Sequence, residues 1–120
     1  MAKRVLIVDD HPGFRGFAKR LLDSAGFLVV GEAEDGGTAL RQAAHLRPDV
    51  VLLDIVLPDR SGLLVAEDLA RNPFPPIVVL VSSRSRADFG LGFEWPAGSV
   101  FLPKHQLSAS TLNDLLVGLA

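Results

Sequence analysis

The chain has 120 residues, a formal net charge of −2 at pH 7 and no cysteine. This length favours one compact domain over residues 1–120, with no room for a second catalytic or DNA-binding domain. The lack of cysteine excludes thiol chemistry, and the lack of a basic cluster argues against direct binding of nucleic acid. The apolar run Val5–Val8 is too short for a signal peptide or a membrane span, so we expect a soluble, cytoplasmic protein.

Five short apolar runs along the chain predict β-strands. Four of them are apolar at every position, which is typical of parallel strands covered by helices on both faces. In chain order the predicted strands are Val5–Val8, Leu28–Val30, Val50–Leu53, Ile77–Val81 and Val100–Leu102.

Helical periodicity appears between and after these runs, over about residues 12–26, 37–46, 62–71 and 108–119. Pro12 suits a first helical turn, and Pro48 prevents the second helix from continuing. The apolar positions expected to face the core are Phe14, Phe17, Ala18, Leu21, Leu22 and Ala25 in the first helix, Ala39, Leu40, Ala43 and Ala44 in the second, and Leu112, Leu115, Leu116 and Leu119 in the last.

Residues 84–96 interrupt this regularity. Gly90, Gly92 and Pro96 are unfavourable inside a helix, so we expect any helix between the last two strands to be short or irregular. Apolar side chains also alternate at period two in this stretch, which predicts that part of it is extended. The alternating residues are Phe89, Leu91, Phe93 and Trp95.

Strands and helices therefore alternate through the whole chain. This alternation predicts an α/β fold, a doubly wound five-stranded parallel sheet between two layers of helices. With the flavodoxin-like strand order 2-1-3-4-5, strands one and three are neighbours at the switch point of the sheet. Ligands of such sheets bind beyond the carboxyl ends of the strands, so the residues that follow each strand carry the functional prediction.

Charged and hydroxyl side chains follow four of the predicted strands. They are Asp9 and Asp10 after the first strand, Asp54 after the third, Ser82 and Ser83 after the fourth, and Lys104 shortly after the fifth. Three carboxylates in one cleft disfavour being ionised together, so we expect a cation among them. Mg²⁺ fits, because it binds through one or two carboxylates plus a phosphate. A carboxylate beside Mg²⁺ and an ammonium group can attack phosphorus.

These residues, in register with the predicted elements, closely resemble those of a response-regulator receiver domain, and the resemblance covers the chain end to end. It implies that Asp54 accepts a phosphoryl group, that Lys104 pairs with the phosphoryl oxygens, and that Ser82 and Phe101 form a switch. It also implies that Mg²⁺ is bound by Asp9, Asp10, Asp54 and the main-chain carbonyl of Val56. Pro58 and Gly62 fall where the family places the loop after its acceptor.

The resemblance further implies the partners. The phosphoryl group would come from a sensor histidine kinase or phosphotransfer protein, and the surface of helix four, strand five and helix five would contact a downstream protein or form a homodimer on phosphorylation. The domain would catalyse its own phosphorylation and dephosphorylation without being an enzyme for a separate substrate. The opening residues resemble receivers that often precede helix-turn-helix output domains. Because the sequence ends after the last predicted helix, we expect such an output to be missing or removed.

Two positions depart from the commonest pattern of the family. Phe101 stands where many receivers have tyrosine, so an aromatic switch would lack a hydroxyl group, and His105 replaces a frequent proline, which removes an expected cis peptide.

Three other functions stay open at this point. A haloacid-dehalogenase-like phosphatase would need an aspartate where the chain has Val56, and the phosphate loop of a flavodoxin-like cofactor carrier would be repelled by Asp9 and Asp10. A receiver that binds proteins without phosphorylation is disfavoured by the complete set of acidic residues, Ser82 and Lys104.

Overall fold

A computed structural model of the chain describes residues 2–90 and 92–117 and confirms the predicted α/β fold. All five strands are parallel, and they lie in the order β2-β1-β3-β4-β5. The elements follow the chain as β1 (Arg4–Val8), α1 (Pro12–Ser24), β2 (Leu28–Ala33), α2 (Gly36–Leu46), β3 (Val50–Asp54), α3 (Gly62–Ala70), β4 (Ile77–Ser82), the 3₁₀ helix η1 (Arg86–Phe89), β5 (Ser99–Pro103), the 3₁₀ helix η2 (Lys104–Gln106) and α4 (Ala109–Val117).

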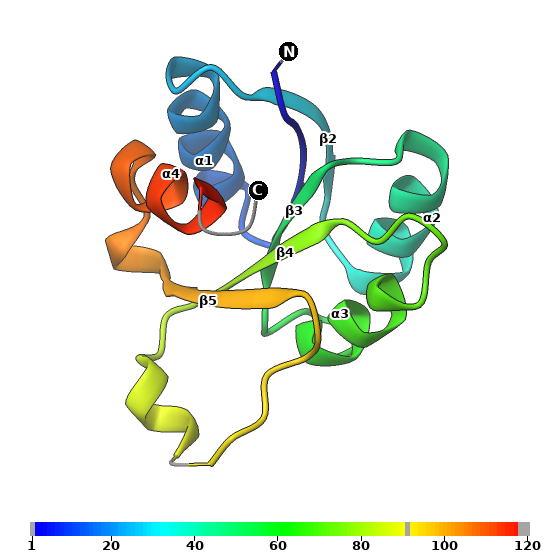
Figure 1. The fold of residues 1–120 in the computed structure, drawn as a ribbon, viewed down its shortest axis with the longest axis vertical. Helices are drawn as coiled ribbons and strands as arrows, with labels where there is room; N and C mark the ends of the chain where they lie inside the picture. The colour runs from blue at the N-terminus through cyan, green and yellow to red at the C-terminus, as the bar shows by residue number, and fades with distance from the viewer. Residues whose placement is uncertain (1, 91, 118–120) are drawn as a thin grey trace.

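The helices form two layers around the sheet (Figure 1). Helices α1 and α4 cover one face, and α2 and α3 cover the other. Successive strand residues point to opposite faces, so both layers are apolar. In β1, Val5 and Ile7 pack toward α1 and α4, whereas Leu6 and Val8 pack toward α2 and α3. The central strands are therefore apolar at every position because both of their faces are buried.

Local sequence signals set several helix ends. Helix α1 begins at Pro12, and α2 and α3 begin after Asp35 and Ser61, whose side chains accept hydrogen bonds from the first-turn amides of Thr38 and Leu63. No helix among the described residues has the length and apolar character needed to span a membrane.

Two residues predicted to face the core are exposed instead. Neighbouring residues of an α-helix point in directions about 100° apart around the helix axis. Phe17 is next to the buried Ala18, and Ala44 is next to the buried Ala43, so each lies beside the buried face of its helix and not within it. The predicted core residue Leu119, and Leu91 of the predicted extended stretch, lie outside the described residues.

The connection between β4 and β5 is irregular, as its glycines predict. Its described residues form only the four-residue helix η1, and Gly90, Gly92 and Gly98 all have positive φ angles of 74° to 83°. No strand forms among the described residues of this connection, so its predicted extended part does not join the sheet. The expected helix four is replaced by η1, and the helix expected as the fifth is the one labelled α4 (Figure 1).

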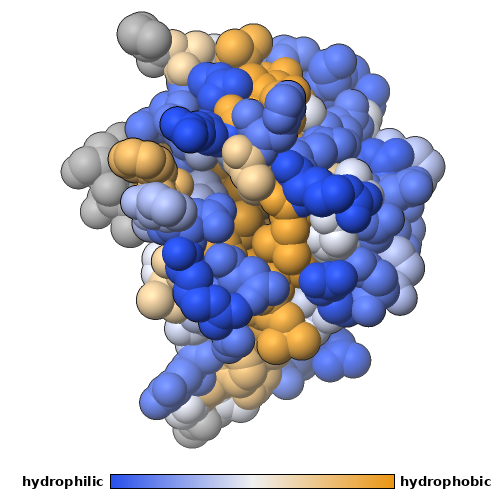
Figure 2. Space-filling view, turned by 90° about the vertical axis from the view of Figure 1, so that its right-hand side faces the viewer, coloured by the Kyte–Doolittle hydropathy of each residue, from blue (hydrophilic) through white to orange (hydrophobic). Residues whose placement is uncertain are grey.

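The face of the molecule formed by α2 and α3 carries an apolar stripe between hydrophilic side chains (Figure 2). Leu64 of α3 and Phe74 of the α3–β4 connection are among the exposed large hydrophobic side chains.

Candidate functional site

The topology brings the predicted site residues to the carboxyl edge of the sheet. Asp9 directly follows β1, Asp54 ends β3, Ser82 ends β4 and Lys104 directly follows β5. Strands β1, β3, β4 and β5 are consecutive neighbours in the sheet, so their carboxyl ends share one edge. Ser83, which the sequence also placed at this edge, is exposed.

Two of the three carboxylates are removed from water. Asp9 is 0% exposed and Asp54 is 3% exposed, whereas Asp10 is exposed. Each of Asp9, Asp10, His11 and Asp54 offers one ligand atom, and these four atoms all lie within 4.8 Å of one another. Carboxylate oxygens are the hard donors that Mg²⁺ prefers, and a buried, unneutralised carboxylate cluster is costly, so the residues present fit a divalent cation.

Lys104 supplies a positive charge between the two buried carboxylates. Its Nζ lies 2.7 Å from Oδ2 of Asp9 and 3.4 Å from Oδ2 of Asp54. It also lies 4.5 Å from the centre of the Phe14 ring, which holds the side chain by a cation–π contact. Burial opposes the charge on this ammonium group, but its contacts with Asp9 and Asp54 together raise the pKa of Lys104 above its ordinary value.

The surroundings of the Asp54 carboxylate act on its pKa in both directions. Burial raises the pKa of Asp54 above its ordinary value, because it removes the charged form from water, and the nearby Asp9 charge acts in the same direction. The N–H group of Val56 donates to Oδ1 of Asp54 at 3.1 Å and, with Lys104, limits that rise. The predicted role of the Val56 carbonyl as a metal ligand stays a prediction.

Gly62 fixes the path of the chain directly after Asp54. A Cβ atom at this position would lie 2.1 Å from the main-chain oxygen of Asp54, so only glycine fits. The Gly62 N–H donates to the carbonyl of Ile55 at 2.7 Å, and Val56 forms a β-bridge with Ser61. The resemblance to the family placed Gly62 in this loop, and close backbone approach is the physical reason for it.

A second contact, through Asp59, holds the same loop and was not predicted from the sequence. The Asp59 carboxylate accepts hydrogen bonds from the amides of Gly36 and Gly37 at the start of α2, at 2.8 and 2.9 Å. These two bonds lower the pKa of Asp59. The partners lie more than 20 positions apart in the chain, so no local pattern indicates the contact.

Both predicted switch residues contact the β4–β5 connection. Ser82 is 2% exposed, and its hydroxyl oxygen accepts a hydrogen bond from the N–H of Arg84 at 3.1 Å. The buried ring of Phe101 stacks on Trp95, with 4.8 Å between ring centres, and meets Phe89 edge-on at 5.6 Å. His105 is exposed, and no cis peptide occurs among the residues that the structure describes, as expected without the usual proline.

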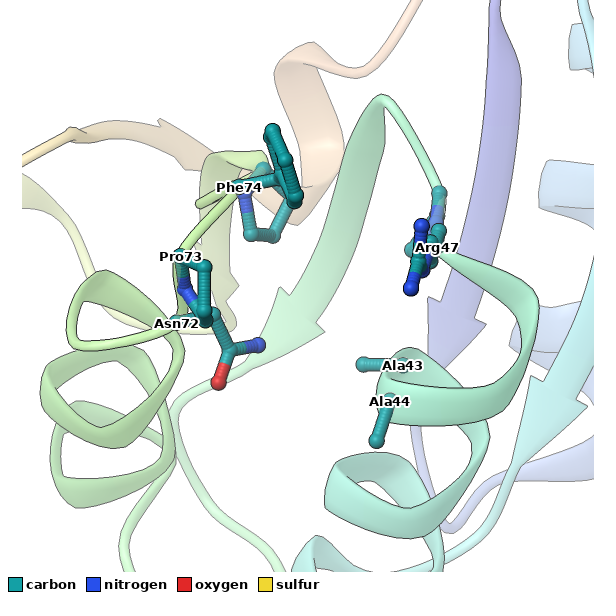
Figure 3. A pocket seen from close by; sticks show the side chains of 8 residues that line it. Ala43, Ala44, Arg47, Asn72, Pro73 and Phe74 are labelled. Carbon is teal, nitrogen blue, oxygen red and sulfur yellow. The ribbon is translucent and has the colours of Figure 1, made fainter.

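A pocket of about 180 Å³ lies away from this edge, between the end of α2 and the α3–β4 connection (Figure 3). Arg47 and Phe74 line it, and the Arg47 guanidinium lies 5.8 Å from the centre of the Phe74 ring. Its lining residues precede β3 and β4, whereas Asp54 and Ser82 end those strands. The pocket is therefore separate from the acidic site.

Comparison with known proteins agrees with the geometry of the site. The family model of the response regulator receiver domain matches residues 5–106, and the chain belongs to this family. Its members act in two-component signalling, in which an aspartate is phosphorylated and Mg²⁺ is bound.

Several curated relatives share this region. The chemotaxis protein CheY of Thermotoga maritima is 38% identical over 80 residues, which are 66% of this chain and 67% of CheY. The DNA-binding response regulator MtrA of Mycolicibacterium smegmatis is 38% identical over 96 residues, 78% of this chain and 41% of MtrA. Protein-glutamate methylesterase/protein-glutamine glutaminase 3 of Hahella chejuensis is 40% identical over 84 residues, which are 70% of this chain but only 24% of that protein.

Solved structures show the same fold. The response regulator receiver domain (CheY-like) from Methylobacillus flagellatus superposes with a TM-score of 0.84 at 26% identity and covers 100% of both chains. The response regulator domain of Thermotoga maritima CheB superposes with a TM-score of 0.71 at 30% identity, covering 98% of this chain and 92% of the other.

The raised pKa of Asp54 predicts how stability depends on pH when metal is chelated. Folding raises the pKa of this carboxyl group. At a pH below its unfolded pKa, about 4, the group does not lower the free energy of unfolding. As the pH rises through its folded pKa, the buried charge destabilises the fold. We therefore expect Asp54→Asn to have a higher thermal midpoint than the wild type at pH 7 in EDTA, with the difference shrinking toward pH 4.

Circular dichroism melts across this pH range provide the measurement. Asp23→Asn, which changes an exposed carboxylate of α1, is the matched control and should leave the midpoint nearly unchanged at every pH. Equal midpoints of Asp54→Asn and wild type at pH 7, or a difference that grows toward pH 4, would contradict the assignment of a destabilising buried charge.

Proposed function

We propose that this chain is a receiver domain over residues 1–120 that accepts a phosphoryl group on Asp54. The observation that carries the proposal is the position of Lys104, whose ammonium group lies 2.7 Å from Asp9 and 3.4 Å from Asp54 at the edge where the acidic residues gather. A nucleophilic carboxylate, a fixed cation and a set of metal ligands in one site are what phosphoryl transfer needs.

Asp9, Asp10, Asp54 and the carbonyl of Val56 would hold Mg²⁺ in this site. When bound, Mg²⁺ neutralises charge that develops on the equatorial oxygens of the transferred group. Asp54 and Asp10 would be direct ligands, and Asp9 would act mainly through water.

The protein groups account for the rest of the transfer. A carboxylate oxygen of Asp54 attacks the phosphorus of a phosphohistidine in line, the new O–P bond forms, and the P–N bond breaks with its electron pair going to the imidazole, which takes a proton from solvent. Lys104 is close enough to Asp54 to move from Asp9 onto a phosphoryl oxygen. The Ser82 hydroxyl donates to another of these oxygens once it leaves Arg84. Water then hydrolyses the acyl phosphate and restores Asp54.

The partners of the proposal follow from this chemistry. The donor is a sensor histidine kinase or phosphotransfer protein, and the output is a downstream protein or a homodimer formed on phosphorylation, all in the cytoplasm. The domain does not turn over a separate substrate. The esterase activity in the name of one relative belongs to that protein, of which the match covers only 24%.

The site counts against the other functions. Two residues after Asp54, where a haloacid-dehalogenase-like phosphatase needs a general acid, the side chain is the exposed Val56. At the end of β1, where a flavodoxin-like protein binds a phosphate group, Asp9 and Asp10 present negative charge.

Intact mass spectrometry tests the acceptor. After incubation with Mg²⁺ and acetyl phosphate, we expect the wild-type chain to gain the mass of one phosphoryl group, and Asp54→Asn to gain none because it lacks the nucleophile. Lys104→Met should give a strongly reduced yield, since the cation beside the transferred group is lost.

The exposed Asp23→Asn is again the matched control and should be modified like the wild type. Phosphorylation of Asp54→Asn to the wild-type level would place the acceptor elsewhere. A wild-type chain that gains no mass from acetyl phosphate or from a phosphorylated histidine donor would favour a receiver that binds partners without phosphorylation.

The switch in this chain involves an irregular segment in place of helix four. The segment 84–98 contacts both predicted switch residues. At one end, the N–H of Arg84 donates a hydrogen bond to Ser82, and near the other end, the ring of Trp95 stacks on Phe101. Movement of Ser82 toward a phosphoryl group breaks its hydrogen bond with the Arg84 N–H, and repacking of Phe101 disturbs its stacking on Trp95. Phosphorylation would thus loosen this segment and alter the surface that it forms with β5 and α4.

Amide hydrogen exchange measures this coupling. With Mg²⁺ and beryllofluoride, a phosphoryl mimic, we expect exchange in residues 84–98 to become several-fold faster while β1 and β3 stay protected. In Asp54→Asn, which cannot take the mimic, exchange should not change. Indistinguishable protection of this segment with and without the mimic in the wild-type chain would rule the coupling out.

A further inference from the structure

The pocket between the end of α2 and the α3–β4 connection has no role in the proposed function (Figure 3). Its volume is about 180 Å³. An apolar cavity of about 150 Å³ is large enough to hold benzene, so this pocket has room for one aromatic ring with a small substituent. The volume thus suits a small organic molecule.

Most of the pocket wall is apolar and rigid. Ala43, Pro48 and Pro76 are its buried lining residues. Pro48 lies on the α2 side, and Pro73 and Pro76 lie on the other side, so the fixed φ angles of proline restrict the backbone of both walls. Phe74 is 74% exposed, which leaves its ring available for contact with a bound ring. A ligand would therefore enter a pocket that is already formed.

Two polar side chains are placed to hold an anion in this apolar setting. Arg47 lines one wall, and the side-chain amide of Asn72 points from the other wall into the space between them (Figure 3). The cation–π contact of Arg47 with Phe74 does not use up the N–H donors of the guanidinium group. None of the described residues that line the pocket is acidic. The pocket is therefore positively charged as well as apolar.

The backbone at Arg47 has an unusual conformation. Its φ angle of 50° lies in the left-handed region, and no other non-glycine residue among those that the structure describes has a positive φ. Nη1 of Arg4 donates to the main-chain oxygens of Leu46 and Arg47 at 2.6 and 2.9 Å and so stabilises this turn. Glycine or asparagine would adopt the same turn with less strain, but neither carries a charge. An arginine at this position is consistent with a use for its side chain.

The one carboxylate close to Arg47 in the sequence already has a partner. Oδ2 of Asp49 accepts a hydrogen bond from the N–H of Arg4 at 2.8 Å, and Asp49 does not line the pocket. The charge of Arg47 is therefore available to a ligand.

We propose that this pocket binds a single-ring aromatic carboxylate. The ring lies against the alanine and proline wall and beside Phe74, and the carboxylate accepts paired hydrogen bonds from the Arg47 guanidinium and one from the Asn72 amide. A neutral ring would not use the positive charge, and an inorganic anion would not cover the apolar wall. This inference does not depend on the proposed function, because the pocket and Asp54 lie at opposite ends of β3.

An NMR titration of the isotope-labelled full chain tests the pocket, with benzoate as the probe. At concentrations up to about 20 mM, benzoate should shift the amide signals of residues 43–47, 72 and 74 and leave those of α1 unchanged. Benzamide has the same shape without the charge, and acetate has the charge without the ring. We expect each to bind at least about tenfold more weakly than benzoate.

Variants separate the two halves of the site. Arg47→Gln should weaken benzoate binding about tenfold and leave benzamide binding nearly unchanged, because only the charge is lost. Phe74→Leu should weaken the binding of both compounds. Arg20→Gln, which changes an exposed arginine of α1, is the matched control and should bind benzoate like the wild type. Thermal midpoints of the variants check that they are folded.

Three results would each overturn the inference. They are the absence of shifts at residues 43–47, 72 and 74 with about 20 mM benzoate, equal affinities for benzoate and benzamide, and an unchanged benzoate affinity in folded Arg47→Gln. Phosphorylation of Asp54 is measured separately by intact mass, so these results leave the proposed function standing.

Discussion

The rest of the site depends on one interaction, the contact of the Lys104 ammonium group with the buried carboxylates of Asp9 and Asp54. Two like charges about 4 Å apart repel by roughly 4 kcal/mol at an effective dielectric constant near 20, so this edge of the sheet needs a cation. One lysine cannot balance three carboxylates, and the remaining negative charge would favour a divalent ion, as proposed. Because Lys104 lies closer to Asp9 than to Asp54, the proposed acceptor Asp54 is the less tightly paired of the two buried carboxylates.

The fold creates this contact from residues far apart in the chain. Parallel pairing of β1, β3, β4 and β5 places all of their carboxyl ends at one edge, and the apolar strands bury that edge deeply enough for its charges to interact strongly. The loop after Asp54 is held from two sides, by the close approach of Gly62 and by the bonds from Asp59 to α2. The same loop presents the Val56 N–H to Asp54, so the position of the Asp54 carboxylate follows from backbone packing as much as from charge.

Most of the sheet and of the acidic site could be predicted from the sequence, because apolar strands and the polar residues after them are local signals. Strand β2 extends to Ala33, beyond the predicted Val30, since an edge strand pairs on one side only and tolerates the polar Glu32. The contacts of Asp59 with α2 and of Phe101 with Trp95 join distant parts of the chain and have no local signature. The irregular β4–β5 connection was predictable from its glycines, but its contacts with the two predicted switch residues, Ser82 and Phe101, depend on tertiary packing.

The most direct test of the central claim is a crystal structure of the chain with Mg²⁺ and beryllofluoride. The account predicts a beryllofluoride adduct on the Asp54 carboxylate, with the Lys104 Nζ moved away from Asp9 and in contact with a fluorine atom. An adduct on another residue, or an adduct on Asp54 with Lys104 still paired to Asp9 and out of reach, would contradict it.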